Sequence, residues 1–153
     1  MSLAQRDKAR AASGRPVRVG LIGAGKFGSM YLSQAPRTPG IHLVAIADLS
    51  PGRAHDALQR VGWDDGRAKA TSFQEAARDG TTFVTDDADG LIASDHVEIV
   101  IDATGSPAAG IHHVLQCCRY GKHVIMVNVE AEVLAGPYLA RKAASTFTMM
   151  TCL

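Results

Sequence analysis

The chain has 153 residues, of which 46% are hydrophobic and 20% charged, and its formal net charge is +1. This length fits one domain, and the apolar fraction with so little net charge excludes intrinsic disorder. Lys and Arg together number 16 against 15 Asp and Glu, and no apolar run approaches the ~20 residues that span a bilayer. We therefore expect neither a nucleic-acid partner nor a membrane partner.

The first sixteen residues are polar and basic. Apart from Asp7, every charged side chain in this stretch is an arginine or a lysine, and the apolar segment of a secretory signal is absent. A transit peptide would also be basic and poor in acids. Chain ends of this composition commonly lie outside the packed core. We predict that residues 1–16 form a flexible basic tail.

The three cysteines are Cys117, Cys118 and Cys152. Adjacent cysteines rarely bridge each other, and no C-x-x-C spacing points to zinc, so a disulfide framework or a zinc site is not expected. Free thiols favour a reducing compartment. The cysteine pattern therefore predicts a cytoplasmic location.

Beyond the tail, short apolar runs alternate with segments of helical character. Glycine and proline separate the segments, and Ser-Pro pairs mark two helix starts. In chain order we predict a strand at Val17–Ile22, a helix at Lys26–Ala35, a strand at Ile41–Ala47, a helix at 51–61, a short helix at 73–79, a weak strand at 81–85, a short helix at 86–93, a strand at 97–101, a helix at 107–120, a strand at 123–127 and a helix at 131–145. Residues 146–153 are rich in strand-favouring types.

This alternation predicts the fold class. Strands separated by helices form parallel βαβ units, and continuous apolar runs indicate strands covered on both faces. We expect an α/β protein with a doubly wound parallel sheet of the Rossmann type, about five to six strands, and helices on both faces. The dinucleotide-binding domain would span residues 17–153.

A glycine-rich loop follows the first predicted strand and opens the first helix. It matches the G-x-G-x-x-G pattern with Gly23, Ala24, Gly25, Lys26, Phe27 and Gly28. In this pattern the first glycine makes the tight turn, the second admits the pyrophosphate of a dinucleotide, and the third allows close helix–strand packing. The amide groups at the helix start would face the negative pyrophosphate. The alternative interpretation is a glycine turn without a ligand.

An acidic residue stands where such a site binds ribose. Asp48 lies 20 residues after Gly28, at the end of the second predicted strand, where a carboxylate can accept hydrogen bonds from the ribose hydroxyls. It would repel a 2′-phosphate and so favours NAD, while Ser50 and Arg53 lie near enough in sequence to bind that phosphate. The cofactor is therefore NAD or NADP. Alternatively, Asp48 only caps the following turn.

Three further residues lie at the ends of later strands. We predict that Thr104 and Gly105 contact the second ribose or the pyrophosphate, and that Asn128 lies beside the nicotinamide. Asn128 could equally cap the helix that starts at Ala131. For Asp102, hydrogen bonding at the strand end is the favoured interpretation.

A metal site is not expected. His112 and His113 are adjacent on a helix and point about 100° apart, so they cannot act like an i, i+4 pair of ligands. Cys117 is near both, but no carboxylate joins them in sequence. No spacing predicts a catalytic triad or a pair of catalytic carboxylates, so the sequence assigns no catalytic residue.

The segments VRVGLIGAGKFGSMYLSQ, VAIADLSPGRA and GKHVIMVNVEAE resemble the cofactor domain of homoserine dehydrogenase-like oxidoreductases, including a branch similar to deoxyxylulose-phosphate reductoisomerase. The resemblance runs from Val17 to about Ala144. It implies a Rossmann domain that binds NAD(P)H and serves a separate C-terminal substrate domain, which we expect to be absent from this chain. True homoserine dehydrogenases carry a catalytic lysine after the strand-end asparagine, whereas Val129 follows Asn128 here.

Together these features predict the cofactor domain of an NAD(P)-dependent oxidoreductase. Its partners would be a nicotinamide dinucleotide and a small carbonyl or hydroxy substrate, with a homo-oligomer left open. We expect the chain alone to bind cofactor without turnover. The alternatives are a non-catalytic nucleotide-binding module and a truncated remnant of such an enzyme.

Overall fold

A computed structural model shows a parallel β-sheet between two layers of helices, and it describes residues 2–146 and 148–152. The elements are α1 (Leu3–Ala12), β1 (Val17–Ile22), α2 (Lys26–Gln34), β2 (Ile41–Ala47), α3 (Pro51–Arg60), α4 (Phe73–Asp79), β3 (Phe83–Thr85), α5 (Ala88–Ala93), β4 (Ile99–Asp102), α6 (Pro107–Tyr120), β5 (His123–Met126), α7 (Val129–Ser145) and β6 (Met150–Cys152), with short 3₁₀ turns at Ala35–Arg37 and Asp65–Ala68.

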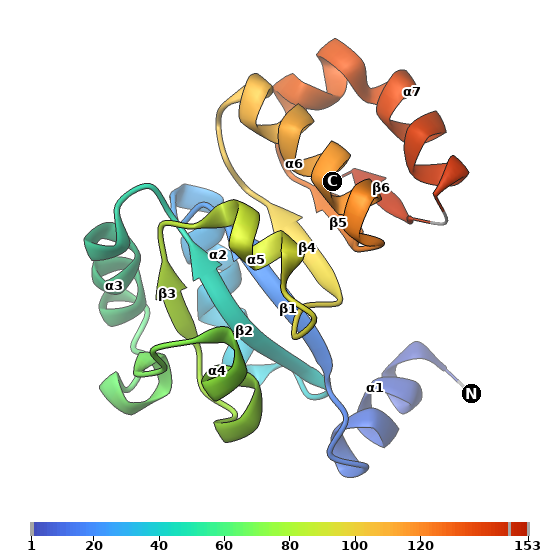
Figure 1. The fold of residues 1–153 in the computed structure, drawn as a ribbon. Coiled ribbons are helices and arrows are strands. Elements are labelled where there is room, and N and C mark those ends of the chain that lie inside the picture. Colours follow the sequence, from blue (N-terminus) through green and yellow to red (C-terminus); the bar gives the residue numbers. More distant parts are fainter. Residues whose placement is uncertain (1, 147, 153) are drawn as a thin grey trace.

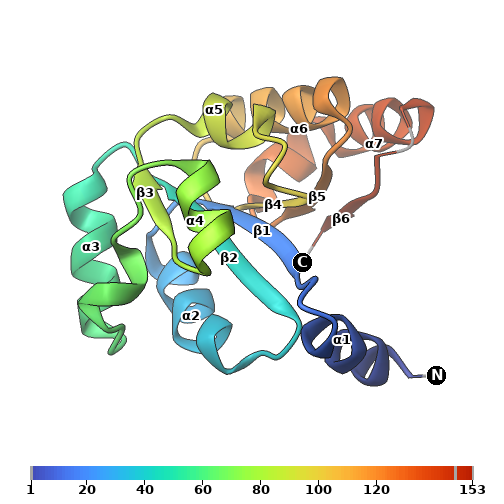
Figure 2. The ribbon, with the colours of Figure 1, turned by 60° about the horizontal axis from the view of Figure 1, so that its bottom comes forward.

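The sheet has six strands in the order β3-β2-β1-β4-β5-β6, and all pairs are parallel. Helices α4 to α7 cover one face, and α2 and α3 cover the other (Figures 1 and 2). This confirms the predicted doubly wound α/β fold of the Rossmann type. Successive strands are added to one side of β1 up to β3 and to its other side from β4 onward, and in such sheets ligands bind beyond the strand ends at this switch point between β1 and β4.

Burial of apolar residues on both sides holds the layers together. Val44, Ala45 and Val100 pack under α4 to α7, whereas Leu21 and Ile46 point to α2 and α3. All five are fully buried. Burial of a side chain such as Leu21 or Ile46 contributes about 1.5–3 kcal/mol to folding.

Residues 1–16, where we predicted a flexible tail, contain helix α1. Ser2 and Gln5 form a capping box at its start, and Arg10 pairs with Glu98 at 3.4 Å. Reciprocal capping satisfies two free N–H groups, which favours a helix in this alanine-containing segment. The prediction missed the helix because α1 lacks an apolar face and lies outside the two helix layers (Figure 1). Met1 lies outside the described residues.

The remaining boundaries follow the predicted helix signals with small shifts. Ser50, Ser72 and Ser106 each accept a hydrogen bond from a backbone N–H in the first turn of the next helix. Helix α5 is capped by Asp87 rather than Asp86, and α7 begins two residues earlier than expected because Asn128 is its cap. The predicted strand-rich segment 146–153 contains β6, although Phe147 and Leu153 lie outside the described residues.

None of the helices in the described part of the chain is long and apolar enough to cross a membrane.

Candidate dinucleotide-binding site

A cleft of about 360 Å³ lies beyond the carboxyl ends of the strands, at the switch point between β1 and β4. Its walls come from the segments that follow β1, β2, β3 and β4. The residues lining it are Ile22, Gly23, Gly25, Ala47, Asp48, Leu49, Arg53, Asp86, Ala88, Ala103, Thr104, Gly105, Ser106, Ala109 and His113. Five of the predicted site residues therefore share one cavity.

The glycine-rich loop has the shape that the pattern predicts. Gly23 has φ +97°, and a Cβ there would lie 2.8 Å from the carbonyl oxygen of Ala103. A Cβ on Gly28 would collide with the carbonyl of Gly23. A Cβ on Gly25 would meet nothing within 4 Å, because this residue faces the open cleft at the start of α2. The first and third glycines thus allow tight packing, and the second leaves room for a ligand.

The other three loop residues are used in different ways. Ala24 is buried, and its N–H donates to Asp48, whereas Lys26 is exposed at the first position of α2. Phe27 is half-buried and packs on the apolar core beneath α2 and α3. Ala24, Lys26 and Phe27 do not line the cleft.

Asp48 ties the loop to the end of β2. Its Oδ2 accepts from Ala24 N–H at 2.9 Å, its Oδ1 accepts from Ser50 N–H at 2.9 Å, and Arg53 Nη2 contacts the two oxygens at 2.8 and 3.0 Å. The side chain is 1% exposed. These contacts match the strand-end interpretation of Asp48, while its ribose contact stays a prediction.

The charge of Asp48 is stabilised where it sits. Burial acts to raise its pKa, but the N–H groups of Ala24 and Ser50 and the guanidinium of Arg53 outweigh burial and hold the pKa below its ordinary value. Arg53 is 58% exposed and lies at the rim of the cleft. A ligand at this rim therefore meets the guanidinium of Arg53 beside an ionised carboxylate that this guanidinium already pairs with.

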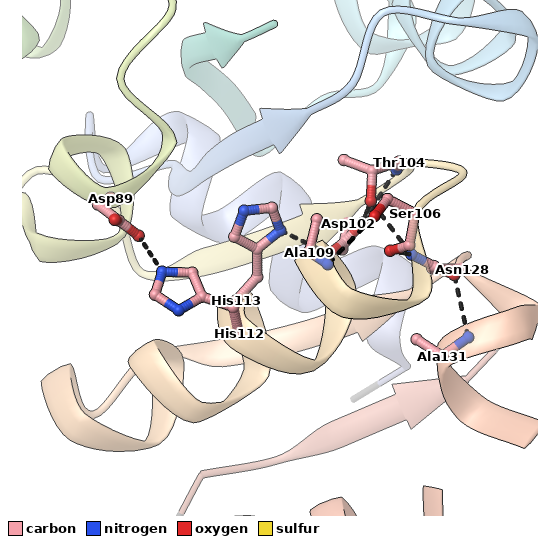
Figure 3. A network of polar contacts seen from close by, with 9 residues as sticks. All are labelled: Asp89, Asp102, Thr104, Ser106, Ala109, His112, His113, Asn128 and Ala131. Atoms are coloured by element: carbon pink, nitrogen blue, oxygen red, sulfur yellow. Dashed lines mark hydrogen bonds and ion pairs between the residues drawn. The ribbon is translucent and has the colours of Figure 1, made fainter. Parts of the chain in front are cut away.

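A second polar cluster lies at the ends of β4 and β5 (Figure 3). Asp102 is fully buried; its Oδ1 accepts from the N–H and the hydroxyl of Thr104, and its Oδ2 lies 2.8 Å from His113 Nδ1. Asn128 Nδ2 donates to Thr104 Oγ1 at 3.1 Å and to the Ser106 carbonyl at 2.7 Å. The cluster fixes the turn that forms one wall of the cleft.

Asn128 is 1% exposed, and its Oδ1 accepts from Ala131 N–H. The capping interpretation is therefore realised, and the amide also joins the ends of β4 and β5. A Cβ on Gly110 would lie 2.6 Å from Asn128 Nδ2, so glycine is needed where α6 passes this amide. Contact of Asn128 with a nicotinamide stays a prediction, as does contact of Thr104 and Gly105 with the cofactor.

His113 is a site residue that the sequence did not identify. It lies on the buried face of α6 and also lines the cleft, whereas His112 is exposed and pairs with Asp89 at 2.7 Å. Its position three residues after buried Gly110 and four before buried Cys117 places it on the core-facing side of the helix, and that spacing was the available signal.

The described residues hold no group of three or more potential metal ligands. Burial raises the pKa of the Cys117 thiol to about 12, so at neutral pH it is a packed, protonated side chain.

A doubly wound sheet that carries this glycine-rich loop at its topological switch point defines a dinucleotide-binding domain. Residues 17–126 match the model of the Gfo/Idh/MocA oxidoreductase family, NAD-binding Rossmann fold. The chain belongs to this family and carries its NAD-binding domain.

Relatives and solved structures agree with this assignment. Inositol 2-dehydrogenase of Rubrobacter xylanophilus is 32% identical over 110 residues, which are 71% of this chain and 26% of that protein. A homoserine dehydrogenase from Thiobacillus denitrificans superposes with a TM-score of 0.70 at 19% identity, covering 90% of this chain and 29% of that one. Biliverdin reductase from Synechocystis sp. PCC 6803, solved with biliverdin and NADP⁺, gives a TM-score of 0.64 at 17% identity, covering 90% and 37%.

The chain thus spans roughly a quarter to a third of the length of these proteins. The structural matches show the shared fold and do not select the homoserine dehydrogenase-like branch.

Proposed function

We propose that the chain binds NADH or NADPH across the glycine-rich loop for hydride transfer to or from a small carbonyl or hydroxy compound. The observation that carries this proposal is the packing of the three glycines. Gly23 and Gly28 have no space for a side chain, whereas Gly25 opens into the cleft. The backbone at Gly25 is thus open to a ligand in the cleft, at the start of α2.

Each part of the bound cofactor would meet different residues. The N–H groups of the first turn of α2, beginning at Lys26, would face the pyrophosphate, because helix N-termini favour anions. Asp48 and Arg53 would adjoin the adenosine ribose, and Thr104 and Gly105 the middle of the cofactor. Asn128 would hold the turn beside the nicotinamide. When bound, the nicotinamide ring supplies or accepts the hydride, and the protein orients it.

The Asp48–Arg53 pair supports acceptance of both cofactors. Arg53 uses Nη2 on the carboxylate, which turns toward Ala24 and Ser50, so a 2′-phosphate would meet the guanidinium rather than a free carboxylate. We therefore expect NADPH to bind at least as tightly as NADH. Arg53→Ala should weaken NADPH binding about tenfold and NADH binding much less, the size expected for a charge-assisted hydrogen bond.

Fluorescence titrations of the purified chain with NADH and NADPH test the proposal. Saturable binding of either cofactor, reduced by Gly25→Val and unchanged by Gly66→Ala, is the expected result. Gly66 lies in the 3₁₀ turn outside the cleft, where a Cβ meets only an ordinary contact. If neither cofactor binds to folded wild-type protein, the proposal is wrong.

Substrate and turnover form a separate part of the proposal. The match to inositol 2-dehydrogenase supports a polyhydroxylated compound as the candidate substrate. We expect the chain alone to bind cofactor without turnover, because its relatives are about three times longer or more. Hydride transfer by the isolated chain to or from such a compound would contradict this.

A further inference from the structure

A buried histidine on α6 lines the cleft and takes no part in the site predicted from sequence. His113 is 6% exposed, and its Nδ1 lies 2.8 Å from Oδ2 of Asp102, which is itself completely buried. The pair joins the first long helix after β4 to the end of that strand. The contact holds the imidazole ring in one orientation.

The second ring nitrogen of His113 points away from Asp102 (Figure 3). Among the residues that the structure describes, none forms a hydrogen bond with Nε2, and Nε2 is not among the solvent-inaccessible side-chain atoms that lack a partner. Because Asp102 is placed to accept the Nδ1 proton, the neutral ring presents the lone pair of Nε2 as an acceptor. The imidazole of His113 thus has one nitrogen bonded to Asp102 and a second nitrogen that can accept a hydrogen bond from a ligand in the cleft.

The cleft that His113 lines includes the end of β2. The lining residues follow β1 to β4, and none of the described residues after β5 joins them. In doubly wound folds the end of the second strand binds the adenosine ribose. Arg53 and Asp48 mark that end here, and His113 shares their cavity.

We propose that His113 is a binding residue for the adenosine half of the cofactor, with Nε2 accepting a hydrogen bond from an N–H or O–H donor of that half. The donor is the exocyclic amino group of the purine or a hydroxyl of the ribose. Asp102 acts as the positioning residue that orients the ring. This inference rests on the proposed function and adds to it a contact that the glycine pattern does not provide.

A variant pair separates the two ring nitrogens. Asparagine places an amide nitrogen where histidine has Nδ1, so His113→Asn keeps a donor for Asp102 and removes only the group that faces the cleft. His112→Asn is the matched control, because His112 is the adjacent residue, lies 50% exposed and does not line the cleft. We expect the His113 variant to bind ADP-ribose about fivefold more weakly, the loss expected for one uncharged hydrogen bond, and the His112 variant to bind like wild type.

A measurement on wild-type protein covers the case in which the variant does not fold. Long-range ¹H–¹⁵N spectra of the imidazoles report hydrogen bonding at each ring nitrogen. Addition of ADP-ribose should shift the Nε2 resonance of His113 and leave His112 in place, whereas nicotinamide mononucleotide should shift neither. AMP compared with IMP and with 2′-deoxy-AMP then identifies the donor as the amino group or the hydroxyl.

The outcomes are distinct. If wild-type protein fails to bind ADP-ribose, NADH and NADPH, the proposed function is wrong and this contact with it. If ADP-ribose binds while the His113 Nε2 resonance and the affinity of His113→Asn are unchanged, only the contact is wrong.

Discussion

Two buried aspartates end two strands of the same sheet, and their partners differ. Asp48 directly follows β2 and Asp102 is the last residue of β4, and each accepts hydrogen bonds from backbone N–H groups. The basic partner of Asp48 is Arg53, whose side chain is 58% exposed, whereas the partner of Asp102 is His113, whose side chain is 8% exposed.

This difference separates two kinds of contact at one cleft. An exposed arginine keeps free N–H groups for a phosphate, and the N–H groups of Ala24 and Ser50 still hold Asp48 if the guanidinium turns. If the buried histidine turned away, the buried Oδ2 of Asp102 would lose its partner, so the orientation of the ring is set before a ligand arrives. We therefore expect substitutions at Asp102 to affect folding first, and substitutions near Asp48 to affect folding less and ligand choice more.

The largest effect is expected for Asp102→Ala. The substitution leaves the Thr104 N–H and His113 Nδ1 without their buried acceptor, and it should lower the free energy of unfolding by about 3 kcal/mol. Urea unfolding followed by circular dichroism measures the change. Asp89→Ala removes the exposed contact with His112 and should stay within about 0.5 kcal/mol of wild type. Equal losses in the two variants would contradict the comparison.

Gly28→Ala tests the loop that Asp48 holds. A new Cβ would collide with the carbonyl of Gly23, so the loop must shift, at a cost of about 2 kcal/mol in the free energy of unfolding. Gly25→Ala, with open space around the new Cβ, should unfold like wild type within about 1 kcal/mol and yet bind NADH more weakly. Thermal unfolding and cofactor titration on both variants give the two readouts. A Gly28 variant as stable as wild type would show that the loop is not tightly packed.

Asp48→Asn should remove a pH-dependent part of the stability. The pKa of Asp48 is lowered in the folded chain, so its contribution is complete above the unfolded pKa of about 3.9 and is lost as pH falls through the folded value. At pH 7 the variant should be less stable by about 1.5 kcal/mol, and the difference should shrink toward pH 3. Urea unfolding at a series of pH values measures this difference, and a constant difference across the range would contradict the assignment.

A smaller stability effect than that of Asp48→Asn is expected for Arg53→Ala. Because most of this side chain is exposed, the ion pair with Asp48 should contribute less than about 1 kcal/mol to the free energy of unfolding. Thermal unfolding at low and at high salt measures the effect. A loss well above that of Asp48→Asn would mean that Arg53, rather than the backbone N–H groups, holds the carboxylate in place.

Local signals in the sequence were enough for most of the fold. The first two strands, Val17–Ile22 and Ile41–Ala47, begin and end where their mostly apolar runs do, as expected for strands covered on both faces. Helix starts followed from Ser50 and Ser106, whose side chains cap the next turn. Helix α1 was missed although Ser2 and Gln5 give it a local capping signal, because it has no apolar face and its one contact with the sheet, Arg10 with Glu98, is distant in sequence.

The site was only partly accessible from the sequence. The glycine spacing placed the loop, because Gly23 and Gly28 have no room for a side chain and Gly25 leaves the cleft open. The contact between Asp102 and His113 depends on how α6 packs against the end of β4, and spacing of 11 residues alone does not specify it. Likewise, the residues next to Asn128 in sequence do not indicate that its amide reaches from the end of β5 to Thr104 at the end of β4.

The most direct test of this account is a backbone ¹H–¹⁵N spectrum of the wild-type chain titrated with NADH. A dinucleotide across the cleft should give its largest shifts at the amides of Gly25, Lys26, Thr104 and Gly105, with little change at Gly80 and Thr82, which precede β3 and lie at the other end of the strands. Unchanged spectra at saturating NADH, or shifts centred on Gly80 and Thr82, would contradict the claim that the glycine-rich loop is the cofactor site.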